Sequence, residues 1–400
     1  MKSSIDGIVI FLILSLIGGI IFLSSKKSIS SKKDPVEKGI HKKLTEVTGA
    51  SRKNWDIFRA DPGLSGKISG RLAEKFEIIW KFKTEGEVKS SAVVKDGVVF
   101  IGSSDGNIYA IALESGKQIW KFKTTDAVEA PAIVVGDIVV AGSYDGLLYA
   151  LDVNSGKLKW KYQTEGKVLA SANRLKTRNG KEKIVVGSYD GKLHCVDMES
   201  GEAVWRYETE SYVNGCAAVF ENRIVFGGCD AKIHVISGKD GSKLRQIDSG
   251  SYIAASAAVD EGFAYVGTFD NVFLKVNIDT GEVVWRYEQT DDPFFSSAAV
   301  GDNVVVFGGK DNFVHCVDKR SGKLVWKFRT GGEVDSSPVI CGEKVVVGSE
   351  DGRLYLLNIA DGKEIWSYEI GESISSSPAI AEGKIIIGSD DGYVYAFEGK

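Results

Sequence analysis

The sequence predicts an all-β protein, an eight-bladed propeller built from four-stranded antiparallel blades. A segment that ends in Trp returns about every 40 residues, and short β-branched or aromatic runs bounded by Asp-Gly and Ser-Gly turns lie between its copies. A fixed period of this length, with four short strands in each repeat, is typical of propellers. The repeat therefore outweighs the chain length of 400 residues, which alone would suggest two or three domains.

The repeated segment has a Gly four residues before its Trp and is clearest at Ser155–Trp160, SGKLKW. A worn copy carries Arg245 where Trp is expected, and Trp80 lies one period before the first full copy. A Trp side chain buries a large rigid surface, so we expect these residues to pack between neighbouring blades. The structural tryptophans of the repeat are Trp80, Trp120, Trp160, Trp205, Trp285, Trp326 and Trp366.

The seventh repeat shows the four expected strands best. They are Val334–Ile340, Lys344–Gly348, Arg353–Asn358 and Glu364–Tyr368, separated by turn residues. The last repeat stops before its fourth strand, whereas Phe76–Lys81 reads as a fourth strand with no first three before it. We therefore expect the N-terminal strand to complete the last blade and close the ring, which removes exposed edges.

Three regions follow from this pattern: an N-terminal anchor over residues 1–25, a basic stem and strap over residues 26–75, and the propeller over residues 76–400. Gly7–Ser25 is uncharged and mostly aliphatic, long enough for one transmembrane helix. A cleaved signal peptide is the alternative interpretation, but the segment has a thin basic start and a poor cleavage site. Within the strap, Trp55 and Phe58 are expected to pack on the folded body.

The membrane side of the propeller stays open at this point. Lys26, Lys27, Lys32 and Lys33 follow the apolar segment and favour a cytoplasmic body, yet a long domain can cross despite a few flanking charges. We expect a single-pass protein with an extracytoplasmic or periplasmic propeller.

Composition and motifs argue against several functions. The net charge is −4, and residues 24–75 are basic, so the remaining body is acidic and a nucleic-acid partner is not expected. The five Cys form no CxxC pair and are expected to be buried strand residues. His194, His234 and His315 share one repeat position, which indicates packing and no metal site. No residue is assigned a catalytic, cofactor-binding or metal-binding role.

Functional residues are expected where the repeats differ. We define the top face as the loops that enter each first strand together with the turns before each third strand. On it, blades three to six are expected to present an aromatic arc, and blades seven and eight an acidic one. Such a surface suits a protein or peptide partner. The alternative is that the rings fill the channel mouth. The candidate residues are Tyr189, Tyr212, Tyr252, Phe269, Phe294, Phe295, Asp335, Glu350 and Asp390.

The segment YALDVNSGKLKWKYQT, Tyr149–Thr164, resembles the PQQ-like repeat, and the resemblance extends over residues 76–400. Asn54–Gly66 also resembles the lead-in found before such propellers. One branch of this family comprises quinoprotein dehydrogenases, and the other comprises non-enzymatic, BamB-like propellers. The chain lacks the vicinal Cys pair and haem motif of the enzymes, and no lipobox Cys follows its apolar segment.

The resemblance implies a membrane-anchored, non-catalytic scaffold for protein interactions, in its most concrete form a BamB-like role in envelope protein assembly. No cofactor is expected. The alternatives are a PQQ-dependent dehydrogenase and a sensor or structural module whose partner is encoded elsewhere.

Overall fold

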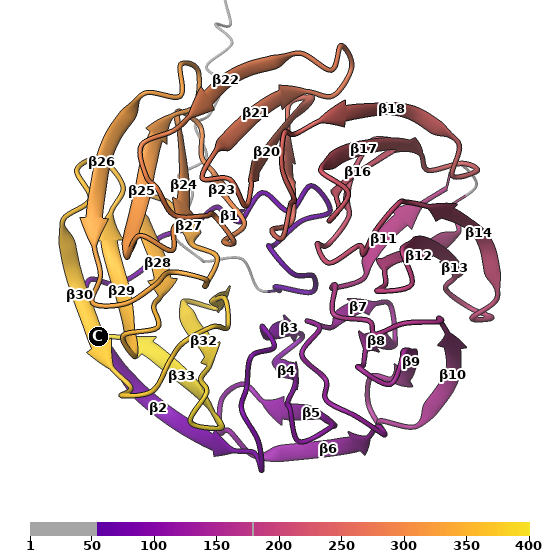
Figure 1. Cartoon of the computed structure of the whole chain (residues 1–400). Helices are drawn as coiled ribbons and strands as arrows, with labels where there is room; N and C mark the ends of the chain where they lie inside the picture. Colours follow the sequence, from indigo (N-terminus) through magenta and orange to yellow (C-terminus); the bar gives the residue numbers. More distant parts are fainter. Residues whose placement is uncertain (1–53, 178–179) are drawn as a thin grey trace, which may run out of the picture. The chain divides into compact units, whose positions relative to one another are not determined.

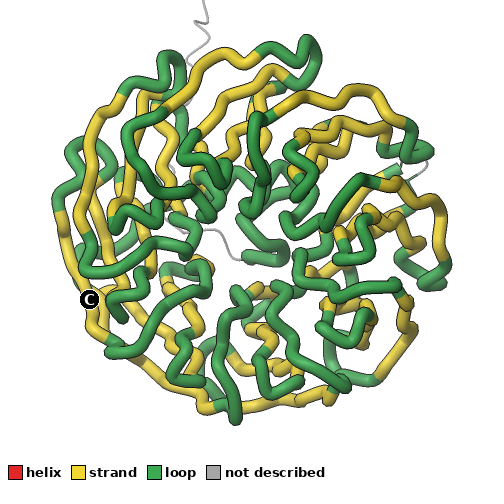
Figure 2. The backbone as a smooth tube through the Cα atoms, viewed as in Figure 1, coloured by secondary structure: helices red, strands yellow, loops and turns green. Residues whose placement is uncertain are grey.

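The computed structural model describes residues 54–177 and 180–400. These residues form eight blades of four antiparallel strands each, arranged as a ring with the fourth strands at the rim (Figure 1). Figure 2 shows that the described part of the chain consists of strands joined by loops. The predicted eight-bladed propeller is confirmed. The predicted anchor and most of the stem lie outside the described residues, and among the residues that are described no helix is long and apolar enough to span a membrane.

Each blade runs from a short strand at the channel to a longer strand at the rim. The strands of blades 1 to 4 are β3 (Val93–Lys95), β4 (Val98–Gly102), β5 (Asn107–Ala112), β6 (Gln118–Lys123); β7 (Ile133–Val135), β8 (Ile138–Gly142), β9 (Leu147–Asp152), β10 (Leu158–Gln163); β11 (Asn173–Lys176), β12 (Glu182–Gly187), β13 (Lys192–Asp197), β14 (Ala203–Glu208); and β15 (Ala218–Phe220), β16 (Arg223–Gly227), β17 (Lys232–Ser237), β18 (Lys243–Asp248).

Blades 5 to 8 repeat the same order, with the last rim strand taken from the N-terminal side. Their strands are β19 (Ala258–Asp260), β20 (Phe263–Gly267), β21 (Phe273–Asn277), β22 (Val283–Tyr287); β23 (Ala299–Val300), β24 (Val304–Gly308), β25 (Phe313–Asp318), β26 (Leu324–Arg329); β27 (Val339–Cys341), β28 (Lys344–Gly348), β29 (Arg353–Asn358), β30 (Glu364–Glu369); and β31 (Ala379–Ala381), β32 (Lys384–Gly388), β33 (Tyr393–Gly399), β2 (Phe76–Lys83).

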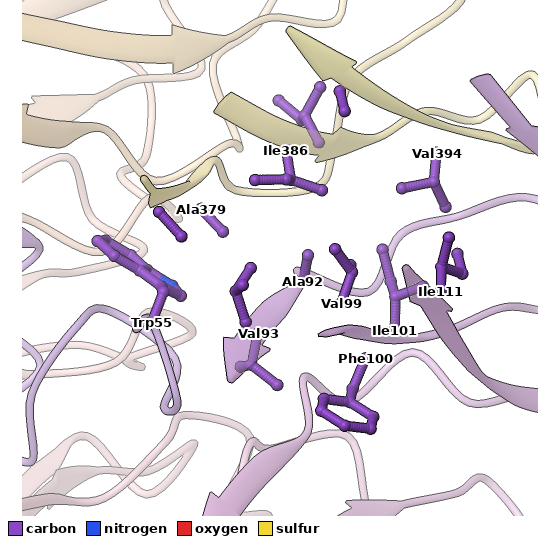
Figure 3. Close-up of a cluster of buried hydrophobic side chains, with 14 of the residues drawn as sticks. Trp55, Ala92, Val93, Val99, Phe100, Ile101, Ile111, Ala379, Ile386 and Val394 are labelled. Atoms are coloured by element: carbon purple, nitrogen blue, oxygen red, sulfur yellow. The ribbon is translucent and has the colours of Figure 1, made fainter. Parts of the chain in front are cut away.

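The ring closes as predicted, because β2 pairs antiparallel with β33 from Phe76↔Gly399 to Lys83↔Tyr393. Blades 8 and 1 then share one apolar core, in which Trp55 lies beside side chains such as Val93 and Ala379 (Figure 3). Closure by a strand from the other end of the chain ties the first and last blades together.

The expected first strand Val334–Ile340 is too long, because β27 begins only at Val339. Pro338 has no N–H for a ladder, and Ser336 and Ser337 bond to neighbouring blades instead. Ser337 N donates to Ser377 Oγ at 3.0 Å, and Ser377 N donates to Ser91 Oγ at 2.9 Å. These serines therefore form an inter-blade belt around the channel wall.

The strap crosses the inner edges of the blades, where unpaired backbone groups need partners. Trp55 bridges Val94 of blade 1, and the carbonyls of the strap accept from Val134, Val219, Val259, Val300 and Ile340 of blades 2, 4, 5, 6 and 7. It continues as β1 (Lys67–Ile68), which adds in parallel to β27.

Arg59 lies within the strap and is 1% exposed. Its guanidinium donates to the carbonyls of Ala298, Ser337 and Pro338. Burial lowers the pKa of Arg59 to about 9. The strap is therefore fastened to blades 6 and 7 through a buried cation.

Six of the repeat Trp side chains, those from Trp80 to Trp326, lie between blades against the Gly of the next blade's Ser-Gly-type turn. Trp366 instead is half-buried and packs against Phe76 and Phe397. A Cβ added to Gly362 would lie 2.6 Å from the ring of Trp326, and one added to Gly156 would lie 2.7 Å from Trp120. These glycines also have positive φ values, so no other residue fits as well. Trp326 Nε1 donates to Ile359 O at 2.8 Å, which satisfies the indole.

Two further interfaces, on either side of blade 4, depart from this arrangement. Trp205 is half-buried and its Nε1 has no hydrogen-bond partner. In blade 4, the aliphatic part of Arg245 takes the Trp position, with Cδ 3.0 Å from the place of a Cβ on Gly281. Blade 4 is thus held less tightly on both sides than its neighbours.

We predict that Arg245→Trp raises the unfolding free energy by about 1–2 kcal/mol, because an indole there would cover Gly281 and bury apolar surface. The matched change Trp326→Ala should lower it by about 3–5 kcal/mol, since that ring is 7% exposed. Denaturant unfolding of the purified variants measures both. A Trp326→Ala variant as stable as the parent would contradict the inter-blade role.

Candidate functional site

The top face brings its two sets of loops together, as predicted. In blade 7, Glu350 N of the turn donates to Glu333 O of the entering loop at 2.9 Å. In the next loop, Ile374 N donates to Ser349 O at 3.2 Å. The same pair of bonds recurs around the ring, for example between Tyr144 N and Ala127 O. Residues that are far apart in the repeat therefore share one surface.

Five of the six predicted aromatic residues reach this surface. Tyr189 and Tyr212 stack with ring centroids 4.8 Å apart, and Phe269 contacts Phe295 at 5.7 Å. Tyr212, Tyr252 and Phe269 are 51%, 57% and 51% exposed. These three side chains are therefore open to solvent. We call Tyr189, Tyr212, Tyr252, Phe269 and Phe295 the aromatic arc.

Phe294 does not belong to this surface, and its assignment there is wrong. The ring is fully buried and packs against Phe273, Phe307 and His315 at 6.0, 5.2 and 5.4 Å. Its place in the repeat is that of a buried aliphatic residue in the other blades: Val88, Val128, Val168, Val213, Ile253, Val334 and Ile374. A comparison of equivalent positions could have shown this from the sequence.

The acidic residues divide into two groups. Asp335 and Glu350 lie around Lys310, whose Nζ is 2.8 Å and 3.9 Å from their carboxylates and 2.5 Å from Glu333. We call these four residues the acidic cluster. Asp390 instead accepts from Ser375 Oγ at 3.1 Å. The sequence did not single out Glu333 or Lys310, because their pairing links two loops of blades 6 and 7.

Charge and burial compete in this cluster. Burial alone would lower the pKa of Lys310, but hydrogen bonds to Asp335 and Glu333 outweigh it and raise that pKa. Burial, together with the neighbouring Asp335 carboxylate, raises the pKa of Glu350. The three carboxylates are close enough to share a cation, with ligand atoms within 4.8 Å of one another. The Lys310 ammonium already lies among them.

A polycarboxylate quinone does not suit the described loops of the top face. Such an anionic cofactor needs cationic donors, and the described top-face loops that enter the first strands or precede the turn Asp residues carry Lys89, Lys167, which lies over the ring of Tyr144, and Lys310. Lys89 pairs with Glu87 at 2.5 Å, and Lys310 is held by the acidic cluster. The surrounding carboxylates of the protein would repel the carboxylates of the cofactor. We therefore derive no chemical step through a quinone.

The three repeat-position histidines form links beneath the top face. His194 Nε2 lies 2.9 Å from Asp190 of its own turn, and its Nδ1 lies 3.0 Å from Tyr162 Oη of the preceding blade. His234 and His315 repeat this arrangement with Tyr207 and Tyr287. In other blades a Tyr donates to the turn Asp directly, as Tyr109 does to Asp105 at 2.7 Å. These histidines join blades.

Burial lowers the pKa of all three histidines and outweighs the nearby aspartates, which act in the opposite direction. The folded histidines are then neutral, so Nε2–H donates to Asp and the Tyr hydroxyl donates to Nδ1. Hydrogen bonds lower the pKa of Asp190 and Asp311 despite burial. These carboxylates therefore lose their contribution to the stability of the fold only near about pH 4 and below.

We predict that the protein loses stability as the pH falls from about 7 to about 5.5. Unfolded His has a pKa of about 6.5 and takes up a proton that the folded side chain resists, at a cost of at most about 1.4 kcal/mol per pH unit for each His. Thermal unfolding midpoints across this range measure the effect. Replacing all three by Tyr, the residue of blades 1, 2, 7 and 8, should flatten the profile; an unchanged slope would contradict this origin.

Comparison with known proteins places the chain in a family. A family model described as outer membrane protein assembly factor BamB matches residues 72–212, 191–312 and 310–400. No match was found among curated proteins.

Three solved structures illustrate the shared fold. BamB from Moraxella catarrhalis is 19% identical, with a TM-score of 0.68 and coverage of 82% of this chain and 98% of that one. The computationally designed Ika8 protein is also 19% identical, with a TM-score of 0.69 and coverage of 79% and 97%. Quinohemoprotein alcohol dehydrogenase from Comamonas testosteroni is 14% identical, with a TM-score of 0.73 and coverage of 88% and 82%. At these identities the likeness concerns the fold alone.

Proposed function

The chain belongs to the family of the outer membrane protein assembly factor BamB, and on that premise we propose that it is a non-catalytic scaffold whose top face docks a protein partner. In its most concrete form the proposal is a role in protein assembly at the cell envelope. The scaffold would be held at the membrane by Gly7–Ser25 as a single span.

The observation that carries the docking role is the exposure of Tyr212, Tyr252 and Phe269, each more than half exposed on one face. Tyr and Phe with rigid rings are favoured anchors at protein interfaces, and clustered exposed rings mark interaction sites. The mixed apolar and charged character of the face also matches the core and rim of an ordinary interface.

A quinone-dependent dehydrogenase is the second candidate, because proteins of that class share the fold. The carboxylates of the top face, which already pair with Lys89 and Lys310, disfavour it. A sensor or structural module remains the third, and it would use the same docking face with a different partner.

We predict that Tyr252→Ser with Phe269→Ser weakens crosslinking of a partner to the top face in cells by at least about tenfold, as loss of interface anchors does. The fold should stay intact, because both rings are exposed. The control is Leu158→Ser with Val204→Ser, two exposed residues of rim strands that should leave crosslinking unchanged.

Unchanged crosslinking in the Tyr252/Phe269 variant would remove the docking role. Titration of the purified protein with PQQ and Ca²⁺ supplies the opposing test. A stoichiometric absorbance change with dye reduction would favour the dehydrogenase.

The membrane location has its own test. We expect the propeller on the extracytoplasmic side, so that protease added after opening the outer envelope digests it while the cytoplasm stays sealed. Protection until the cytoplasmic membrane is broken would contradict this placement. Release into the soluble fraction would contradict the retained span.

A further inference from the structure

We infer that the partner segment recognised by the top face presents a Lys or Arg directly beside an apolar or aromatic side chain. This inference rests on the proposed docking function and specifies the chemistry of the partner. It follows from the contact between the aromatic arc and the acidic cluster.

The acidic cluster has more negative charge than its single lysine can neutralise. Glu333, Asp335 and Glu350 surround one ammonium, that of Lys310, so the four side chains together bear a net charge of −2 when ionised. Asp335 Oδ1 is buried and has no hydrogen-bond partner among the described residues. A buried carboxylate oxygen without a donor is costly, and a positive charge nearby stabilises that carboxylate.

The apolar and charged parts of the surface meet at Phe295. Its ring lies 5.1 Å from Lys310 Nζ on one side and 5.7 Å from the ring of Phe269 on the other. Phe269 is 51% exposed, while the acidic side chains are partly exposed. A bound segment can therefore place one apolar side chain on Phe269 and its neighbour at the carboxylates.

Lys310 shows how a cation is held at this place. Its ammonium makes charge-assisted contacts with carboxylates while it lies over an aromatic ring, and both interactions favour cations. A guanidinium or ammonium from a partner would find the same environment with charge still to be compensated. An acidic segment or a nucleic acid would be repelled.

The test selects random displayed peptides on the purified full-length chain and measures the affinity of the selected peptides by fluorescence anisotropy. We expect them to carry a basic residue next to an apolar one. Their affinity should fall about tenfold in an Asp335→Asn, Glu350→Gln double variant and should weaken with added salt. The matched control Glu199→Gln, Glu282→Gln removes two exposed carboxylates from turns on the opposite face and should bind as the parent does.

Each other outcome decides a separate point. Peptides that depend on Tyr252 and Phe269 but show no basic preference, or bind the double variant equally well, would overturn this inference and leave the docking role standing. Peptides selected for acidic residues would overturn it as well. If no selected peptide is weakened by Tyr252→Ser with Phe269→Ser, the docking role and this inference both fall.

Discussion

The ring depends on the contact between a Trp of one blade and a turn Gly of the next. At six of the interfaces the indole occupies space that any Cβ on that Gly would need, and the same Gly takes a positive φ that other residues disfavour. One position therefore meets two constraints, a backbone conformation and a close approach. This double requirement explains why a Gly and a Trp four residues apart mark every well-formed copy of the repeat.

The same contact explains where the ring departs from regularity. Blade 4 offers no acceptor to Trp205 and supplies Arg245 where its own Trp should be. The loops entering and leaving this blade carry Tyr212 and Tyr252, the two most exposed tyrosines of the aromatic arc. Packing is thus relaxed in the sector of the ring that presents aromatic side chains to solvent. Blades 7 and 8 present polar side chains such as Asp335, Glu350 and Asp390 on the same face.

The repeat made most of the fold predictable from the sequence. The predicted strands Lys344–Gly348 and Arg353–Asn358 agree with β28 and β29, because every blade repeats the same order of buried strands and turns. The course of the strap could not be predicted from the repeat. It depends on single contacts, such as those of Arg59 with Ala298 and Pro338, and these contacts do not recur along the chain. The Lys310 contacts are of the same kind. The wrong assignment of Phe294 to the top face had a different cause. Phe294 and Phe295 are neighbours in an extended loop, and neighbouring side chains of such a loop point to opposite sides.

That error also yields a criterion for separating structural from functional aromatic residues in a repeat protein. Phe294 fills a position that is apolar and buried in every blade, so packing accounts for it completely. Phe269 fills a position held by Ser104, Tyr144, Lys310 and Asp390 in other blades, so the propeller itself does not require a ring there. An exposed Phe gives up the apolar burial that would stabilise the fold. The top face therefore holds aromatic residues that the fold does not require, and the proposed partner, by burying them, would supply the missing reason.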